Sequence, residues 1–409
     1  MKAAGIIAEY NPFHNGHRYH LEETRALTGA EAVVAVMSGD FTQRGEPAAW
    51  DKWHRARMAV DNGADLVLEL PFVFACNHGE GFAAGGVGLL DRLGCVEWLS
   101  FGSESGSLEE LEAAASFLAE EGPAFRQTLR ECLDGGMSYP RAREAALRAA
   151  GKEKEASLLL LPNNILAVEY LKELRRRGSR MKAVTVPRKG GAYNDEAGEA
   201  PYASAAACRR RLEAGEETAA LEDVLPPETI AVLGEALRWD EDASRRLYAM
   251  TAYRILTGRE EELREILSAG EGLENRLKKA VTEEGCRDMR TLTALAGSKR
   301  YTAARIRRLL VHSLAGLTGE AWEELIREEI LYARVLGLSR TGARLLRHIK
   351  KTGCASVPVL TNVNKELSPG EPAEKLLKYD ILASRLWHLA AEGSLYARSD
   401  YIMGPYVKK

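Results

Sequence analysis

Two histidines with an asparagine and a glycine between them stand near the start of the chain, in "AEYNPFHNGHRYH". Imidazoles at this spacing can hydrogen-bond phosphate oxygens and stabilise charge on a leaving pyrophosphate. Gly16 would let a flat group approach the backbone closely. A zinc pair is the other chemistry open to His14 and His17, but no nearby cysteine or second His/Glu set completes a shell. The spacing therefore favours phosphate binding over zinc, with plain helix-capping as the simplest alternative.

The elements around these histidines place them where ligands bind in α/β proteins. "KAAGIIA", residues 2–8, is a short apolar run that predicts a buried strand. Asn11 and Pro12 interrupt it, and an amphipathic helix is expected from Gly16 onward. The histidines then lie beyond the carboxyl end of a strand, the usual ligand position in an open sheet. They also lie at a helix N-terminus, whose free N–H groups attract anions.

The first half of the chain alternates strand and helix signals. Further strands are expected at residues 32–37 and 65–71, from residue 96 running into the loop that holds Gly102, and at 183–187, and helical patterns separate them. Such alternation is typical of an α/β fold with a parallel sheet and right-handed crossovers. The glycine-rich helix from Gly79 should pack closely on that sheet. We therefore expect a Rossmann-like domain with a parallel sheet in this half.

The second half of the chain has a different pattern. From about residue 220 strand signals fade, and helical patterns continue to about residue 351, with one short strand expected near 355–367. The expected organisation is a catalytic domain at residues 1–219 and a mainly helical region at residues 220–409. The helical region is a candidate for RNA binding, through the arginines described next.

One helix in the second half carries a basic stripe. In "SKRYTAARIRRLLVH", Tyr301, Arg305 and Arg308 recur at helical spacing, and Arg300 widens the polar side. Such a face suits an RNA backbone, with Tyr301 able to stack on a base. A charged face that only meets solvent is about equally expected from the pattern. Arg175–Arg177, with Arg180 and Lys182, form a second candidate patch.

Composition limits the other classes. The 409 residues carry a net charge of −3, so any contact with nucleic acid must use a local patch. The six cysteines are scattered without a C-x-x-C pair, which suggests reduced thiols and a cytoplasmic location. No apolar run is long enough to span a bilayer, and the first residues do not form a signal peptide. No protein metal ligand is assigned.

The motifs together resemble a known family. "FHNGH" is similar to the H-x-G-H signature of the nucleotidyltransferase superfamily. The ordered blocks "GIIAEYNPFHNGHRYH", "VMSGDFTQRGEPAAWDKWHRARMA", "GADLVLELP", "SFGSE", "PNNILAVEYLKEL" and "SKRYTAARIRRLLVH" resemble the bacterial tRNA(Met) cytidine acetate ligase family across nearly the whole chain. The resemblance implies that acetate attacks ATP to give acetyl-adenylate and pyrophosphate. The acetyl group would then move to N4 of the wobble cytidine (C34) of elongator tRNA(Met), giving N4-acetylcytidine.

The resemblance also implies residue roles. His14 and His17 would be catalytic, and Arg300, Tyr301, Arg305 and Arg308 would contact tRNA. Mg²⁺ is expected with ATP, held mainly by phosphates and water. The implied ATP-binding residues are Ile7, Ala8, Glu9, Tyr10, Asn11, Pro12, Phe13, His14, Asn15, Gly16, His17, Arg18, Tyr19, His20, Gly102, Asn163, Arg188 and Lys189.

Several choices stay open at this point. Asn163 is only slightly favoured over Asn164 as a nucleotide contact, because an asparagine here could simply cap a helix. Asp40, Lys52 and Arg209 are weaker candidates for active-site residues. The acetate pocket, the residues that recognise the cytidine and the oligomeric state are not assigned. A small-molecule adenylyltransferase would explain the H-x-G-H segment but not the arginine helix. A non-enzymatic RNA-binding protein would not need both histidines.

Overall fold

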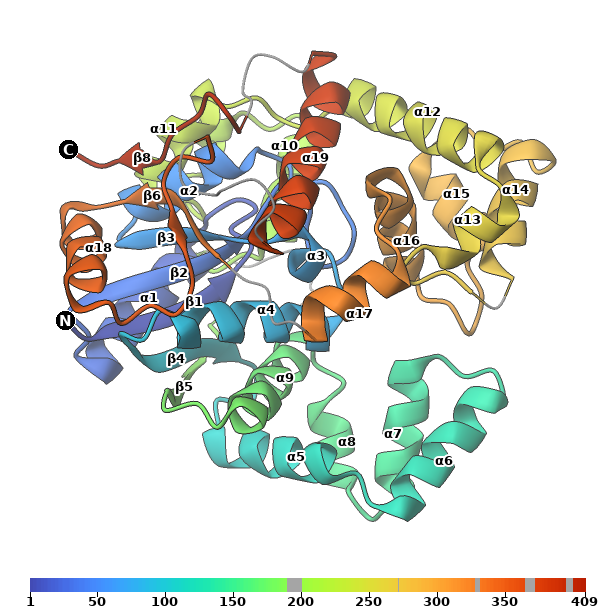
Figure 1. The fold of residues 1–409 in the computed structure, drawn as a ribbon, viewed down its shortest axis with the longest axis horizontal. Helices are drawn as coiled ribbons and strands as arrows, with labels where there is room; N and C mark the ends of the chain where they lie inside the picture. Colours follow the sequence, from blue (N-terminus) through green and yellow to red (C-terminus); the bar gives the residue numbers. More distant parts are fainter. Residues whose placement is uncertain (190–200, 271, 328–331, 365–371, 395–399) are drawn as a thin grey trace.

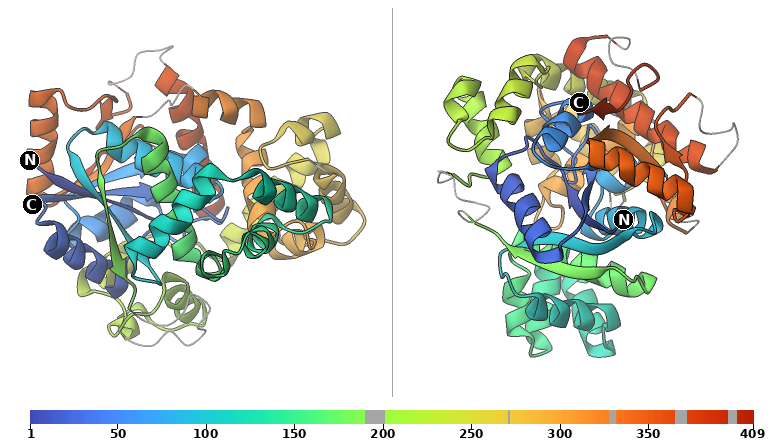
Figure 2. Two further views of the ribbon diagram at one scale, coloured as in Figure 1. Left: turned by 90° about the horizontal axis from the view of Figure 1, so that it is seen from below. Right: turned by 90° about the vertical axis from the view of Figure 1, so that its left-hand side faces the viewer.

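A computed structural model describes residues 1–189, 201–270, 272–327, 332–364, 372–394 and 400–409. Its centre is one sheet with helices on both faces (Figures 1 and 2). Four parallel pairings join β1 (Ala3–Ala8), β2 (Ala32–Ser38), β3 (Leu66–Leu70), β4 (Val96–Ser103) and β5 (Lys182–Pro187). The expected parallel sheet of the first half is confirmed.

The strands are apolar because both faces of the sheet are covered. In β2, Val34 and Val36 face one core and Val33, Ala35 and Met37 face the other. On the first face lie α4 (Gly79–Arg92), α9 (Pro162–Arg177), α18 (Arg340–Thr352) and α19 (Pro372–Glu392), and on the second lie α1 (Asn15–Thr28), α2 (Lys52–Asp61), α10 (Ala205–Glu213) and α11 (Pro227–Glu235).

The glycines of α4 pack closely on the sheet, as expected from the sequence. A Cβ atom on Gly86 would lie 2.6 Å from Cδ1 of Ile7 on β1, and one on Gly85 would lie 2.4 Å from Cβ of Phe74 in the short helix that follows β3. Real Cβ atoms do not come this near to other heavy atoms. Glycine therefore lets α4 approach β1 and brings the start of the helix beside the carboxyl ends of the strands.

The sheet also contains strands from the second half of the chain. The strand order is β5-β4-β1-β2-β3-β6-β7, with β8 (Tyr406–Val407) paired to β6. β6 (Ala333–Leu338) runs antiparallel to β3, and β7 (Val359–Leu360) lies parallel to β6. The expectation of continuous helix to about residue 351 was wrong here, and a boundary at residues 219/220 would divide this sheet. A short apolar run such as "ARVLGL" does not distinguish a buried strand from a buried helix.

Most of the remaining second half forms a helical unit with its own core. Buried residues of this unit, from Ile255 to Leu310, form a separate hydrophobic cluster. The unit comprises α12 (Glu241–Thr257), α13 (Glu260–Glu265), α14 (Leu273–Thr282), α15 (Met289–Ala296) and α16 (Ala303–Ala315), and α17 (Gly319–Arg327) follows. Figure 1 shows these helices beyond one end of the sheet.

A second group of helices lies between β4 and β5 in the sequence. In Figure 1 the α6–α7 pair faces the helical unit across the same end of the molecule. These helices are α5 (Leu108–Glu120), α6 (Pro123–Asp134), α7 (Tyr139–Ala149) and α8 (Glu153–Leu158). Elsewhere in the chain, α3 (Phe72–Ala75) follows β3, and a 3₁₀ turn (Thr218–Leu221) follows α10.

Candidate nucleotide-binding site

The H-x-G-H segment (His14–His17) links β1 to α1. Tyr10 takes a left-handed conformation with φ of 49°, which turns the chain after the strand. His14 is the N-cap of α1, and its Nδ1 accepts a hydrogen bond from Gly16 N at 3.0 Å. Nδ1 of His17 accepts in turn from His14 N at 3.3 Å. Helix capping and phosphate binding, the two alternatives that the sequence left open, are therefore compatible for His14 and His17.

These backbone bonds fix the tautomer of both rings. A neutral imidazole that accepts at Nδ1 carries its hydrogen on Nε2. The two rings lie side by side, with centroids 3.7 Å apart and planes 30° apart. Each ring can therefore present one Nε2–H donor, and both line the same cavity. Paired donors of this kind suit phosphate oxygens.

Burial keeps the histidines neutral. Burial, and to a smaller extent the positive charges of Arg188 and Arg209, lower the pKa of His14 to about 3. The pKa of His17 is also well below its usual value, first by burial and then by its histidine and arginine neighbours. Burial lowers the pKa of His20 to about 4. The rings therefore act as neutral hydrogen-bond donors at neutral pH.

Gly16 serves the histidine pair itself. A Cβ atom at this position would lie 2.8 Å from Cε1 of His14. The flat group that approaches the backbone here is therefore the His14 ring, and it can do so because Gly16 has no side chain. The spacing alone suggests instead that the glycine makes room for a ligand.

The histidines open onto a cavity of about 980 Å³ at the carboxyl ends of the strands. This volume lies at the upper end of the usual range for small-molecule sites. Fourteen of the expected ATP-binding residues line it, namely Ile7, Ala8, Glu9, Tyr10, Asn11, His14, Gly16, His17, Tyr19, His20, Gly102, Asn163, Arg188 and Lys189.

The other four expected ATP-binding residues have different surroundings. Phe13 is fully buried in a core cluster, and Pro12 is buried beside it in the sequence. Asn15 donates to the carbonyl of Asp223 at 3.2 Å, and exposed Arg18 bonds Glu22 at 3.2 Å. Within the described chain, these residues are not among those that line the cavity. They shape the turn and hold α1 instead.

The two asparagines at the start of α9 have separate tasks. Asn164 is fully buried, and its Oδ1 accepts from the backbone N–H groups of Glu104 and Ser105 at 2.9 and 3.2 Å. Asn163 lines the cavity and donates to Glu104 Oε1 at 2.7 Å. Asn164 therefore fixes the loop after β4, whereas Asn163 can reach a ligand.

Gly102 and the two cations after β5 form the neighbouring wall. A Cβ on Gly102 would lie 3.4 Å from Cγ of Arg188, so a larger side chain would press on that arginine. Arg188 donates to Oδ1 of Asn163 at 3.4 Å. The Lys189 ammonium lies 4.0 Å from the ring centroid of Tyr19. Both cations line the cavity and can neutralise an anion there.

The arginine stripe forms an inner wall of the same cavity. We call Arg300, Arg305 and Arg308 the α16 wall, because all three line it. Arg305 donates to Ser268 O at 3.2 Å and Arg308 to Gln43 O at 3.3 Å. The sequence pattern suggests instead a separate outer surface. Periodicity shows which residues share a helix face but not what covers that face, so it could not place these arginines on the cavity.

Tyr301 does not have the role that its position in the stripe suggests. Only 7% of its surface is exposed, and its ring belongs to the core of the helical unit. The Arg305 guanidinium lies 5.0 Å from the ring centroid. Base stacking on this tyrosine, as expected from the sequence, is wrong for this conformation. The ring supports Arg305 instead.

Several cavity residues were missed or ranked low. Gln43 and Arg44 lie in the loop after β2, which the rule on carboxyl ends of parallel strands could have found. Arg209 lines the cavity too and donates to Asn11 O at 2.6 Å, which supports the turn before the histidines. Arg143 and Glu169 come from helix interiors, where no sequence pattern points to a site.

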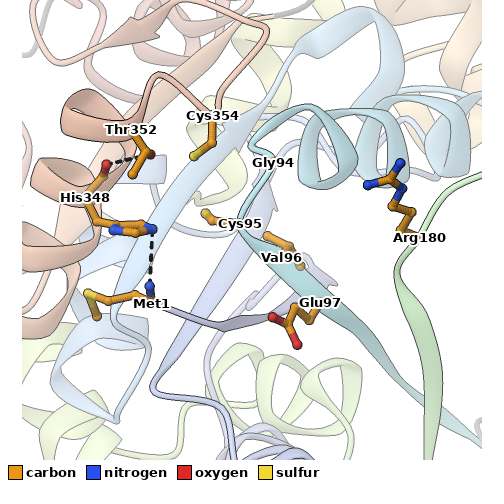
Figure 3. Close-up of a pocket in the computed structure, with 9 residues that line it drawn as sticks. All are labelled: Met1, Gly94, Cys95, Val96, Glu97, Arg180, His348, Thr352 and Cys354. Carbon is orange, nitrogen blue, oxygen red and sulfur yellow. Dashed lines mark hydrogen bonds between the residues drawn. The ribbon is translucent and has the colours of Figure 1, made fainter.

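A smaller cavity of about 360 Å³ lies at the opposite end of the strands (Figure 3). Figure 3 shows Met1, Cys95 and His348 there, with the Met1 amino group 3.2 Å from Nε2 of His348. It is bounded by the amino ends of β1 and β4. Ligands of parallel sheets bind at the carboxyl ends, so the larger cavity is the candidate site.

Metal-binding clusters and membrane-spanning helices are not found in the described ranges. There, no group of three or more His, Cys, Asp or Glu side chains is arranged to hold a metal ion. Across the same residues, no helix is both long and apolar enough to cross a bilayer.

Comparison with known proteins agrees with this geometry. Residues 1–400 match the family model of the HIGH nucleotidyl transferases. A tRNA(Met) cytidine acetate ligase of Caldicellulosiruptor saccharolyticus is 39% identical over 389 residues, covering 94% of this chain and 93% of that protein. One from Caldanaerobacter subterraneus is 38% identical over 404 residues, covering 98% of each.

Solved structures are similar over the full length. The apo crystal structure of Thermotoga maritima TmcAL has a TM-score of 0.89 and 30% sequence identity, covering 100% of this chain and 99% of that one. The same protein bound with alpha-thio ATP has a TM-score of 0.88 with the same identity and coverage.

The sheet, the cavity at its carboxyl edge and the paired histidines define a nucleotidyl transferase of the H-x-G-H class. Within that class, the chain belongs to the tRNA(Met) cytidine acetate ligase family.

Proposed function

We propose that this protein is an ATP-dependent ligase that activates acetate and acetylates elongator tRNA(Met). Acetate attacks the α-phosphorus of ATP, which releases pyrophosphate and gives acetyl-adenylate. N4 of the wobble cytidine then attacks the acetyl carbonyl, AMP leaves, and N4-acetylcytidine forms. The names of the similar ligases support this assignment, and a similar structure bound with an ATP analogue supports the ATP part.

The observation that carries the proposal is the pair of fixed Nε2–H donors. Gly16 N and His14 N occupy the Nδ1 atoms, so His14 and His17 need no rearrangement to bind phosphate. Donors held in place before the reaction stabilise developing charge most effectively. On this proposal they bind the phosphates, while Arg188 and Lys189 add positive charge beside them. Asn163 and the space beside Gly102 serve the nucleoside.

The α16 wall is the proposed meeting point with tRNA. Arg300, Arg305 and Arg308 line the cavity that also holds the histidines. A cationic wall there can take backbone phosphates of the anticodon loop while the target base enters the cavity. The proposed tRNA-binding role thus lies at the junction of the helical unit with the sheet. A cytoplasmic location follows from a tRNA substrate.

Mg²⁺ is proposed to accompany ATP. Glu9 is a carboxylate on the cavity, but Arg44, Arg55 and Arg209 act on it electrostatically, which disfavours a divalent ion at that position. When bound, the ion would be held mainly by the triphosphate oxygens and water, and it would supply positive charge to the phosphates.

Two assays test the proposal. The first follows exchange of labelled pyrophosphate into ATP with and without acetate. The second detects N4-acetylcytidine by mass spectrometry in a tRNA(Met) transcript and in a matched transcript carrying uridine at the wobble position. The proposal requires acetate-dependent exchange and acetylation of the cytidine transcript alone. Exchange that depends on a mononucleotide would indicate a small-molecule adenylyltransferase, and no exchange would indicate a binding protein.

A further inference from the structure

Glu9 follows β1 directly and places a carboxylate on the cavity wall. Its backbone carbonyl accepts from Arg55 Nη1 at 2.7 Å, and its side-chain Oε1 accepts from Gln43 N at 2.8 Å. Among the described residues, no protein group donates a hydrogen bond to the other carboxylate oxygen, Oε2. The carboxylate is therefore fixed in position with one oxygen available to a ligand.

Glu9 lies between the groups proposed for the two substrates. On one side, the Arg209 guanidinium influences both Glu9 and His14 electrostatically, so the carboxylate is near the proposed phosphate site. On the other side, Gln43 donates its N–H to Glu9 and accepts at its carbonyl from Arg308 of the α16 wall. One residue therefore separates Glu9 from the proposed RNA side.

A carboxylate is the wrong charge to hold ATP phosphates. A carboxylate instead binds an N–H donor or takes up a proton, and the cytosine that receives the acetyl group offers both. Cytosine presents its N4 amino group as a donor, which glutamate side chains accept in nucleic-acid recognition. That amino group must also lose a proton when it becomes an amide nitrogen.

We propose that Glu9 is the residue that binds the N4 amino group of the acceptor cytidine and removes its proton during acetyl transfer. The inference rests on the proposed function. N4 attacks the acetyl carbonyl of acetyl-adenylate, and a C–N bond forms. The bond between the acetyl carbon and the phosphate oxygen breaks, so AMP leaves with that electron pair. The N4 proton passes to Glu9 Oε2 and then to water.

The surroundings of Glu9 favour a base that works near neutral pH. Burial raises the pKa of Glu9, and the hydrogen bond from Gln43 with the arginine neighbours opposes this only in part. A carboxylate with a raised pKa is a better base than a free one, provided it is still deprotonated at the working pH. The charged and titratable groups that face it are Arg44, Arg55, Tyr170, Cys76 and Arg209.

The test supplies chemically prepared acetyl-adenylate, so that ATP activation is bypassed. The single-turnover rate of acetyl transfer to the tRNA(Met) transcript is measured for the wild type and for Glu9→Gln. Glutamine keeps an acceptor for Gln43 N but cannot take the proton. We expect transfer to fall about 100-fold or more, the usual scale for general-base catalysis. The wild-type rate should rise with pH along an acidic limb, and the variant should lack that limb.

A matched control is Glu97→Gln, which removes an exposed carboxylate at the opposite end of the strands. It should transfer at close to the wild-type rate. Glu9→Asp, which keeps a shortened base, should retain the pH limb at a reduced rate, and its thermal unfolding reports on folding. Transfer by Glu9→Gln at the wild-type rate, or rescue of that variant by added Mg²⁺, would overturn the inference. Wild-type protein that transfers no acetyl group would instead contradict the proposed function.

Discussion

At the residue scale, one set of hydrogen bonds fixes both the start of α1 and the orientation of the two candidate catalytic histidines. His14 caps α1, and His17 accepts from the backbone of His14, so both Nδ1 atoms are used structurally. The opposite edge of each ring stays available to a ligand. Because the capping bonds set the tautomer, they also decide which ring atom carries the donor hydrogen.

His17→Ala tests this arrangement at the level of one side chain. The substitution removes one of the fixed Nε2–H donors, so acetate-dependent pyrophosphate exchange should fall about 100-fold or more. The fold should change little, since the protein hydrogen bond removed is the one from His14 N. His348→Ala, at the far end of the sheet, is the control and should exchange normally. Normal exchange by the His17 variant would remove that residue from the proposed mechanism.

At the scale of one element, α16 lies between the two proposed substrate regions. Its Arg308 holds the loop after β2 through Gln43, and a Cβ on Gly45 would lie 2.4 Å from Arg308 N. His312 sits with Nε2 2.7 Å from Cys76 O and Nδ1 3.2 Å from Leu267 O. The helix is therefore bound to the sheet domain as well as to the helical unit, and its arginines are carried at a fixed place on the cavity.

Replacing Arg305 and Arg308 together with Gln tests the role of this helix. Each arginine that neutralises a tRNA phosphate releases counterions, so affinity should weaken as salt rises. The double variant should bind tRNA(Met) more weakly and show a salt slope shallower by about 0.7 for each single-strand phosphate that it no longer neutralises. Filter binding across a salt series measures both quantities. Acetate-dependent exchange, measured in parallel, should continue.

The control for this pair lies on another face of the molecule. Arg344 and Arg347 are exposed on α18, close to the N-terminus in Figure 1. Their joint replacement with Gln removes the same charge and should leave the salt slope unchanged. Equal slopes for all three proteins would show that the α16 wall does not bind phosphates, and Arg175–Arg177 would become the next candidates.

Across the whole molecule, a buried charge network joins the two halves of the chain. Lys52 of α2 is fully buried, and its Nζ lies 2.8 Å from Glu69 of β3 and 2.7 Å from Asp400 near the C-terminus. Arg334 of β6 contacts the same two carboxylates at 3.1 and 2.7 Å. Lys52, a weaker candidate in the sequence, is not among the described residues that line the cavity, and it ties the C-terminal segment to the sheet instead.

Lys52→Met should destabilise the folded protein strongly. The change leaves two buried carboxylates with Arg334 as the shared cation of this network, and breaking a buried pair in this way costs about 3–5 kcal/mol. Urea unfolding monitored by circular dichroism measures the loss. Lys2→Met is the comparison, because its partner Glu97 is 3.0 Å away but both side chains are exposed. That variant should lose less than about 1 kcal/mol, and equal losses would contradict the network's role.

The buried histidines predict that the protein is destabilised by acid. Burial lowers the pKa of His14 to about 3 and of His20 and His312 to about 4, against about 6.5 when unfolded. The unfolded chain therefore binds more protons between these values. The contribution of these histidines to the free energy of unfolding is fully present above about pH 6.5 and is lost as the pH drops toward 4.

Urea midpoints at pH 7.5, 6 and 5 measure this effect. Burial raises the pKa of Glu9 and Asp380, and these acids act in the opposite direction, but the lowered imidazoles outnumber them. The midpoint should fall steadily with acid, and His312→Asn should reduce the slope because one imidazole is removed. A midpoint that stays constant from pH 7.5 to 5 would contradict the assignment of neutral buried rings.

The sequence by itself determined the parallel sheet, the strand-to-helix position of His14 and His17, and the close packing of α4. These features follow from local periodicity and from residue types that favour particular backbone positions. The ordered motifs likewise indicated the family. None of these predictions depends on which segments of the chain meet in space.

Tertiary structure alone decided which side chains share the cavity. β6 joins the sheet because β3 offers an unpaired edge, which the apolar run at residues 333–338 could not reveal. Tyr301 precedes α16 by two residues and Arg305 lies in its first turn, yet one is buried in a core and the other lines the cavity. Glu9 obtains its place between the two proposed substrate regions from Gln43, Arg209 and Arg308. Long-range packing sets burial and neighbouring charge, and these set what each side chain can do.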